Sequence, residues 1–395
     1  MRFGFSLLLS LLSAATMAQD PWPRHTIDPV DAETARAGAD GVRIGYLNGD
    51  LLPDIVTGWE EGNAIRVCIN PGPEKSKAPW PAVTVGRVKN AEDAVFADLD
   101  GDGWLDVISS CEGKTRSHFV HWAPASAKGL LTESNWKTEV IPATEKREAW
   151  MFTLPCDVDG DGDVDLITGS KNQGASVSWL SNPGRESARD LTSWKLHRIA
   201  DAGWIMSLRI LEQEGERFLV YSDRKGAHSG IFISPIAGKA PFFGEPVLIG
   251  GGGEEVMFLD LALLDDDGKL DVVASIRPDK THVIYQPDDP LTLWEDSADL
   301  EPLDLETYGT AKAVKVGLID DDQIPDFVIT CENAKGKLKG VLFGTVFSEF
   351  EAVSDAEGVK YDRIELLDLD DDGDLDIITC EEKAGLGVVW FENPQ

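Results

Sequence analysis

Residues 156–166 read C-D-V-D-G-D-G-D-V-D-L and decide the fold of this 395-residue chain. The stretch places a carboxylate at every second position, and in a tight turn these charges would repel one another unless a divalent cation neutralised them. Calcium suits such a loop because it accepts about six to eight oxygen ligands in a flexible shell. Gly160 and Gly162 let the backbone adopt the positive φ angles that wrap oxygens around an ion.

The spacing D-x-D-x-D-G-x-x-D occurs in three places along the chain. An EF-hand loop begins in the same way, but it ends in a Glu at the twelfth position, where these loops have Ser109, Thr168 and Thr379. A short β-branched run follows each loop, so each loop joins two strands. The sequence therefore predicts three calcium sites, with the ligands Asp98, Asp100, Asp102, Asp106, Asp157, Asp159, Asp161, Asp165, Asp368, Asp370, Asp372 and Asp376.

The last Asp of each loop has counterparts elsewhere in the chain. Related segments end at Asp54, Asp271 and Asp326, and a segment ending at Phe218 fills the one double interval. The chain thus contains seven units of roughly 50 to 60 residues, each rich in short strands. This pattern predicts an all-β fold, a seven-bladed β-propeller with four antiparallel strands per blade.

The two ends of the chain complete one blade. The seventh unit stops after its third strand, and residues 22–27 repeat the W-x-x-H-x-I pattern of residues 194–199, a fourth strand. We therefore expect the N-terminal strand to complete the last blade and close the ring, which leaves no open sheet edge. His25 and His197 mark the same repeat position and are not predicted to be catalytic.

Composition limits the partners and the location of the protein. The net charge of -34, from 70 acidic and 36 basic residues, argues against nucleic acid as a partner. Residues 1–18 resemble a cleaved export signal, residues 19–395 are expected to form one domain, and no later run is long enough to span a membrane. We expect a secreted or periplasmic monomer. The five scattered cysteines form no disulfide framework and allow one bridge at most.

The acidic loops, the N-P-G strand endings and the W-x-x-H-x-I strands resemble those of secreted FG-GAP/VCBS-repeat proteins, which are related in fold to the integrin α-subunit propeller. The resemblance covers about residues 22–395. It implies calcium between the first and second strands of some blades, and a role in extracellular binding or adhesion. Blades one, four, five and six depart from the motif, since Leu263 and Leu318 replace the first Asp in two of them.

A ligand site is predicted on the face opposite the acidic loops, where connecting segments carry bases and aromatic residues. An acidic or hydroxyl-rich ligand, such as a uronic-acid glycan, would suit forked guanidinium contacts and tryptophan stacking. An extracellular protein ligand is the other partner considered. The predicted ligand-binding residues are Arg147, Trp150, Trp204, Arg224 and Arg277.

Catalysis is the alternative function. Some sugar-processing enzymes carry similar propellers, so a carbohydrate lyase or dehydratase stays open, although the sequence has no nucleophile elbow, zinc-protease helix or phosphate loop. A lyase needs a base beside a neutralising cation. Glu148, Glu254, His228, Tyr361 and Arg147 offer such groups, but their spacing does not link them.

Overall fold

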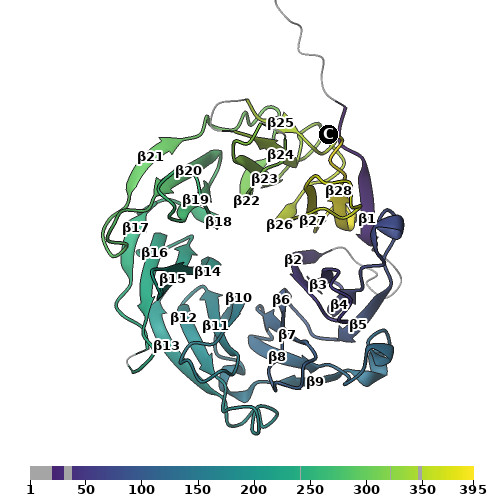
Figure 1. Cartoon of the computed structure of the whole chain (residues 1–395), viewed down its shortest axis with the longest axis vertical. Coiled ribbons are helices and arrows are strands. Elements are labelled where there is room, and N and C mark those ends of the chain that lie inside the picture. The colour runs from purple at the N-terminus through teal and green to yellow at the C-terminus, as the bar shows by residue number, and fades with distance from the viewer. Residues whose placement is uncertain (1–19, 31–37, 241, 321, 346–348) are drawn as a thin grey trace, which may run out of the picture.

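The computed structural model describes residues 20–30, 38–240, 242–320, 322–345 and 349–395, so the expected export signal at residues 1–18 lies outside the described residues. Seven four-stranded antiparallel sheets surround a central axis, and the first strand of each sheet lies nearest to that axis (Figure 1). The predicted seven-bladed β-propeller is therefore confirmed.

Each of the first four blades uses four consecutive strands. Blade 1 contains β2 (Ala39–Gly45), β3 (Asp54–Trp59), β4 (Ala64–Cys68) and β5 (Ala82–Gly86). Blade 2 contains β6 (Ala91–Ala97), β7 (Asp106–Cys111), β8 (Ser117–Trp122) and β9 (Lys137–Val140). Blade 3 contains β10 (Ala149–Cys156), β11 (Asp165–Lys171), β12 (Ser176–Ser181) and β13 (Lys195–Asp201). Blade 4 contains β14 (Ile205–Gln213), β15 (Glu216–Asp223), β16 (Gly230–Ile236) and β17 (Val247–Gly250).

The last blade differs because it takes its outer strand from the N-terminus. Blade 5 contains β18 (Val256–Ala262), β19 (Asp271–Ile276), β20 (Lys280–Tyr285) and β21 (Glu295–Asp299). Blade 6 contains β22 (Thr310–Gly317), β23 (Asp326–Glu332), β24 (Val341–Gly344) and β25 (Glu351–Ala352). Blade 7 contains β26 (Tyr361–Leu367), β27 (Asp376–Glu381), β28 (Gly387–Phe391) and β1 (Arg24–Asp28). Single-turn helices η1 (Pro73–Lys75), η2 (Ala127–Gly129), η3 (Glu133–Asn135) and η4 (Pro142–Thr144) lie in connections.

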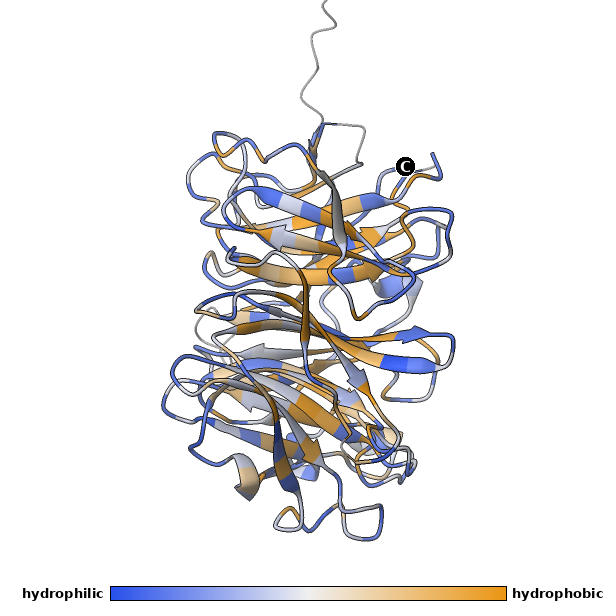
Figure 2. Cartoon of the chain, turned by 90° about the vertical axis from the view of Figure 1, so that its left-hand side faces the viewer, coloured by the Kyte–Doolittle hydropathy of each residue, from blue (hydrophilic) through white to orange (hydrophobic). Residues whose placement is uncertain are grey.

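Burial explains the strand sequences. Every residue of the second strands β3, β7, β19 and β27 is buried, because both faces of each sheet pack against neighbouring blades. The outer strand β13 is largely exposed and polar. Figure 2 shows the same contrast, with hydrophobic colour on the strands and hydrophilic colour on many of the loops. The β-branched runs after the acidic loops are thus the core of each blade.

Tryptophans and asparagines join neighbouring blades. Trp390 of blade 7 donates its indole N–H to the carbonyl of Ser76 in blade 1, at 3.2 Å. Asn182, which ends the third strand of blade 3, donates to the carbonyl of Leu99 in blade 2 at 2.9 Å. Asn393 does the same between blades 7 and 6. The Asn-Pro strand endings at Asn182 and Asn393 therefore carry cross-links between blades.

The N-terminal strand closes the ring as predicted. β1 pairs antiparallel with β28, with His25 opposite Trp390. Their ring centroids are 4.6 Å apart, and the rings of His197 and Trp179 repeat this contact in blade 3 at 4.8 Å. The two histidines thus occupy one repeat position on outer strands, which confirms that interpretation of the sequence.

Cysteine pairing and membrane crossing were the remaining structural expectations. All five cysteines are free, and four are buried, each in a different blade, so the single bridge that the sequence allowed does not form. None of the helices in the described ranges combines the length and the hydrophobicity that a membrane crossing requires.

Candidate functional site

Three acidic loops join the first and second strands of blades 2, 3 and 7. In the loop of blade 3, Gly160 and Gly162 adopt positive φ angles of 77° and 91°. Their backbone N–H groups point inward and donate to the carboxylate of Asp157 at 2.8 and 3.1 Å. The predicted positive φ angles of the two glycines are therefore confirmed, and they fold the backbone around the first carboxylate of the loop.

The loops bring most of the predicted metal ligands together. In each loop, three carboxylates each have an oxygen within 4.8 Å of the others. No such group occurs in the acidic loops of blades 1, 5 and 6 within the described ranges. Asp106, Asp161 and Asp372 belong to the loops but not to these closest groups. The groups are Asp98 with Asp100 and Asp102, Asp157 with Asp159 and Asp165, and Asp368 with Asp370 and Asp376.

Each group contains a buried carboxylate oxygen that has no hydrogen-bond partner. These atoms are Oδ1 of Asp98, Oδ1 of Asp159 and Oδ1 of Asp370. A buried carboxylate oxygen without a donor is unfavourable, and a hard cation with oxygen ligands would satisfy it. The residues present therefore fit calcium.

Two of the loops also receive a base from the next blade. Arg189 pairs with Asp100 across the boundary between blades 3 and 2, and Lys77 lies 3.0 Å from Asp370 across the boundary between blades 1 and 7. These bases offset part of the charge of two loops. Among the described residues, no side-chain base pairs with Asp157, Asp159 or Asp161 in the loop of blade 3.

The last Asp of each loop has a structural role that the sequence analysis did not recognise. Asp165 accepts N–H groups from Val158 at the start of its loop (3.1 Å) and from Asn182 at the end of the third strand (2.7 Å). Asp54 and Asp271 make the same two contacts in blades without a full calcium set. This Asp recurs even in loops that lack the other carboxylates of the motif, and that recurrence could have indicated its structural role.

Burial makes these carboxylates hard to ionise in the absence of metal. It raises the pKa of Asp106 to about 8, although the N–H groups of Ala123 and Leu99 act in the opposite direction. It also raises the pKa of Asp376 to about 7 and that of Asp165 to about 6. A bound divalent cation would favour the ionised forms.

Replacing Asp54 tests the structural role apart from calcium. Asp54→Ala leaves the N–H groups of Leu47 and Asn70 without their acceptor, and we expect a loss on the order of 3 kcal/mol in unfolding free energy. Asp50→Ala, in the exposed part of the same loop, is the control and is expected to cost under about 1 kcal/mol. Urea unfolding in EDTA measures both. Equal losses of unfolding free energy in the two variants would contradict a structural role for Asp54.

The opposite face of the ring carries a charge on every blade. One charged residue stands at or directly after the end of each second strand, and we call these seven residues the mouth ring. Two of the three bases, Arg224 and Arg277, are among the predicted ligand-binding residues, whereas the four acids were not predicted, although repeat alignment could have shown them. The mouth ring consists of Glu60, Glu112, Lys171, Arg224, Arg277, Glu332 and Glu382.

A second set of equivalent positions lies near the start of the first strands, and we call it the inner ring. It changes from acidic in blades 1, 2 and 7 to methionine in blades 3 to 5, with a lysine in blade 6. The face opposite the acidic loops therefore carries acids as well as the predicted bases and aromatic residues. The inner ring consists of Asp40, Glu92, Met151, Met206, Met257, Lys312 and Asp362.

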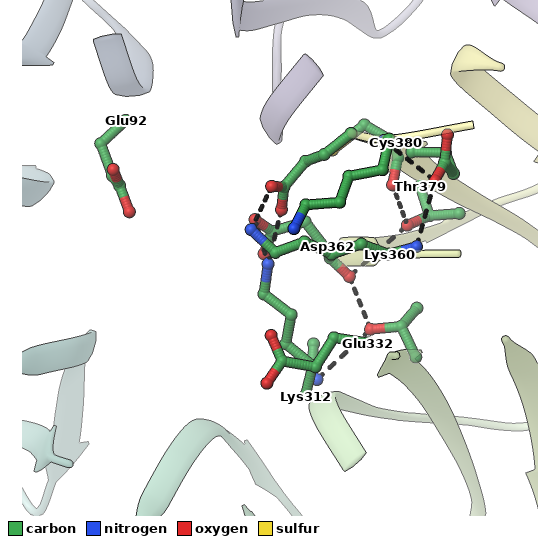
Figure 3. Close-up of polar contacts among 12 residues, drawn as sticks. Glu92, Lys312, Glu332, Lys360, Asp362, Thr379 and Cys380 are labelled. Atoms are coloured by element: carbon green, nitrogen blue, oxygen red, sulfur yellow. Dashed lines mark hydrogen bonds and ion pairs between the residues drawn. The ribbon is translucent and has the colours of Figure 1, made fainter. Parts of the chain in front are cut away.

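Lysines neutralise acids of both rings in blade 7, and Lys312 does so across the boundary between blades 6 and 7. Lys312 lies 2.8 Å from Asp362 and 2.7 Å from Glu382, and Lys360 also pairs with Glu382. Figure 3 shows Lys312, Lys360 and Asp362 gathered in one polar group, with Glu92 apart from it. Burial opposes ionisation of Asp362, but Lys312 outweighs it and holds the pKa of this carboxyl below its usual range.

The acids of blades 1 and 2 are less well compensated. Oxygens of Asp40, Glu60 and Glu92 lie within 4.8 Å of one another. Burial raises the pKa of Glu92 to about 7, although Lys171 lies 3.6 Å away and lowers it. Burial and the charge of Glu382 also raise the pKa of Asp40. Burial therefore disfavours the ionised forms of both carboxylates on this side of the channel mouth.

Two of the predicted ligand residues meet on one acid. Arg224 lies 2.6 Å from Oε1 of Glu255, Arg277 lies 3.2 Å from the same oxygen, and Lys225 lies 3.8 Å away. Burial alone would raise the pKa of Glu255, but these three bases hold it below its usual range. We call Arg224, Lys225 and Arg277 the carboxylate cradle, because they already hold one carboxylate.

The other predicted ligand residues have different surroundings. Trp204 lies beside the cradle, with Arg224, Lys225 and Lys171 within 4.7 Å of its ring centroid. Trp150 is completely buried and donates its indole N–H to the carbonyl of Thr144, so it offers no face for stacking. Arg147 is exposed on the segment before β10.

A cavity of about 460 Å³ opens beside Trp204, between blades 3 and 4. Asp223 lines it and accepts the N–H groups of Gly203 and Trp204, both at 2.7 Å. The rings of Tyr221 and Phe232, which also line it, stack at 5.3 Å. Its size and its mixed lining of aromatic, acidic and basic groups suit a small polar ligand.

Three of the residues considered for a lyase lie far apart in the ring of blades. Glu148 accepts hydrogen bonds from Ser170 and Ser176 in blade 3, whereas Glu254 is bound by His282 and Lys280 in blade 5. Tyr361 is completely buried in blade 7. Glu148, Glu254 and Tyr361 therefore lie in different blades, whereas His228 lines the cavity between blades 3 and 4 together with Asp223.

Comparison with known proteins agrees with the architecture. A family model for the FG-GAP-like repeat matches residues 46–109. The crystal structure of Saccharomyces cerevisiae Sqt1 is similar at a TM-score of 0.52 and 14% identity, covering 94% of this chain and 99% of that one. The Dos1 propeller is similar at a TM-score of 0.51 and 10% identity, covering 89% and 78%. No curated protein sequence matches the chain. At these identities the solved structures support the fold alone.

Proposed function

We propose that this chain, a β-propeller with FG-GAP repeats, is an exported calcium-binding module that holds an acidic carbohydrate on the face opposite its calcium loops. Residues 1–18 would direct export, and residues 19–395 would act as one monomeric domain in a secreted or periplasmic location. Calcium would occupy the loops of blades 2, 3 and 7. The buried, unpartnered oxygens of Asp98, Asp159 and Asp370 support this assignment.

The carboxylate cradle is the single observation that carries the ligand proposal. Arg224, Lys225 and Arg277 converge on Glu255 in a protein of net charge -34. The side chain of Glu255 is 37% exposed, so a uronate carboxylate from solution can compete with it for the same bases. The cavity beside Trp204 would then receive a neighbouring sugar ring.

Changing the charge of Glu255 tests this competition. We expect Glu255→Gln to bind an oligogalacturonate several-fold more tightly than the unchanged protein, because Arg224 and Lys225 lose the carboxylate they share and Arg277 keeps only Glu332, 2.8 Å away. Arg224→Ala combined with Arg277→Ala should weaken binding at least tenfold, a loss of about 1.4 kcal/mol. Calorimetric titration with saturating calcium gives each Kd. Affinity should fall as salt rises, because exposed charges are screened over about 8 Å at physiological ionic strength.

Lys137→Ala is a matched control, since Lys137 is an exposed base on the outer strand β9 that pairs only with Glu139 among the described residues. It should leave the Kd unchanged. Binding that responds equally to Lys137→Ala and to the double cradle change, or no binding by any variant, would refute the ligand proposal. Neither result would bear on the calcium loops.

A further inference from the structure

The central channel contains a buried arginine, Arg363, that forms no ion pair among the residues that the structure describes. Directly below the inner ring, the next residues of the seven first strands form another layer across the channel. The arginine of this layer lies against its two phenylalanine rings. The layer consists of Gly41, Asp93, Phe152, Ser207, Phe258, Ala313 and Arg363.

Arg363 extends from blade 7 toward two aromatic rings of other blades. Its guanidinium carbon lies 5.6 Å from the ring centroid of Phe152 in blade 3 and 5.3 Å from that of Phe258 in blade 5. The two rings contact each other edge to face at 5.3 Å. Arg363 is only 4% exposed, so this cation lies inside the channel.

The guanidinium of Arg363 lacks the partners that its burial requires. Its Nε and Nη1 atoms are buried and make no hydrogen bond, and no carboxylate in the described residues forms an ion pair with it. A buried charge is normally paired, because losing its hydration without compensation is costly. The aromatic faces supply only a weak substitute for an anion.

The neighbouring channel charges already have partners. Arg43 donates to Asp93 through Nε and Nη2, at 3.0 and 2.8 Å. Arg209 lies 3.7 Å from Asp260. Lys315 lies 3.7 Å from both Asp260 and Glu365. Asp93, Asp260 and Glu365 thus pair with the other bases of the channel. Arg363 is the base that forms no ion pair among the described residues.

Arg363 stays charged at neutral pH despite its surroundings. Burial, together with the nearby charges of Arg43 and Arg209, lowers its pKa to about 9, although the charges of Asp93 and Glu365 act in the opposite direction. Deprotonation therefore does not remove the unpaired charge under ordinary conditions. Three guanidinium groups close together in one channel also create a positive potential that favours an anion.

We propose that the channel binds one small monovalent anion, of halide size, at Nε and Nη1 of Arg363. One positive charge remains uncompensated in this layer, which argues for a single negative charge. The phenylalanine rings occupy much of the layer, which argues for a small ion. This site is separate from the calcium loops and from the carboxylate cradle.

Bromide locates the proposed ion directly. Crystals of the full chain grown with sodium bromide should show an anomalous scattering peak within hydrogen-bond distance of Nε and Nη1 of Arg363. Crystals of Arg363→Met should lack that peak, since methionine has similar length and no charge. Absence of the peak in the unchanged protein would overturn the proposal.

Thermal stability supplies a second measurement that needs no crystals. With calcium saturating and ionic strength fixed, we expect the Tm of the unchanged protein to be several degrees higher in chloride than in gluconate, which is too large for the site. The difference should disappear in Arg363→Met and persist in Arg198→Met, an exposed arginine on β13. An equal chloride effect in all three proteins would contradict the site. If Arg363→Met does not fold, the bromide peak and a saturable chloride response of the unchanged protein decide the matter.

Discussion

Removal of calcium with EDTA is expected to lower the melting temperature of this protein by on the order of 10 °C. Three loops would bind calcium only in the folded state, and each contributes about 2.7 kcal/mol when calcium exceeds its Kd a hundredfold. Spread over the unfolding entropy of a chain of 395 residues, this sum gives a shift of that order. Differential scanning calorimetry with calcium and with EDTA measures it.

The calcium effect should also depend on pH. Without metal, burial raises the pKa of Asp106 to about 8 and that of Asp376 to about 7, above the value of about 4 for an unfolded Asp. The folded state then binds more protons, so stability in EDTA falls as the pH rises from about 4 to about 8. Calcium replaces those protons. The shift in Tm should accordingly be larger at pH 8 than at pH 5, and the reverse order would contradict the assignment.

Deletion of residues 22–29 is expected to abolish the monomeric, cooperatively folded protein. It removes β1, which pairs with β28 from Arg24 to Asp28. It also removes Trp22, which packs against Phe343 of blade 6 at a centroid distance of 5.5 Å. The exposed edge of β28 would then pair with other chains and cause aggregation. Size-exclusion chromatography and thermal denaturation of the purified protein test this.

Deletion of residues 1–18 alone is the matched control, because that segment precedes β1. It should leave a monomer with an unchanged Tm. A protein without residues 22–29 that also eluted as a monomer and melted normally would show that the ring does not need its N-terminal strand.

Sequence periodicity predicted the fold well because each blade repeats the same physical requirements. The buried Asp at the start of the second strand recurs from Asp54 to Asp376, so the repeat length could be measured even where the calcium set is incomplete. The same regularity placed His25 beside Trp390, as His197 lies beside Trp179. Residues at the same position of each repeat pack in the same way in each blade, so the spacing in the sequence predicts the packing in the structure.

The channel face was harder to predict because its contacts cross blades. The pairing of Lys312 with Glu382 joins residues far apart in sequence, and no spacing rule connects them. Likewise, nothing local shows that Arg224 and Arg277 meet on Glu255, or that Trp150 is buried. Repeat alignment could have shown that all seven mouth-ring positions are charged. It could not have shown which charges remain unpaired.

Metal stoichiometry tests the proposed calcium binding most directly. After dialysis against calcium and then against metal-free buffer, inductively coupled plasma mass spectrometry should find three calcium ions per chain. The Asp161→Ala variant, altered only in the loop of blade 3, should retain two. No bound calcium in the unchanged protein, or the same number in both proteins, would contradict the assignment of these three loops.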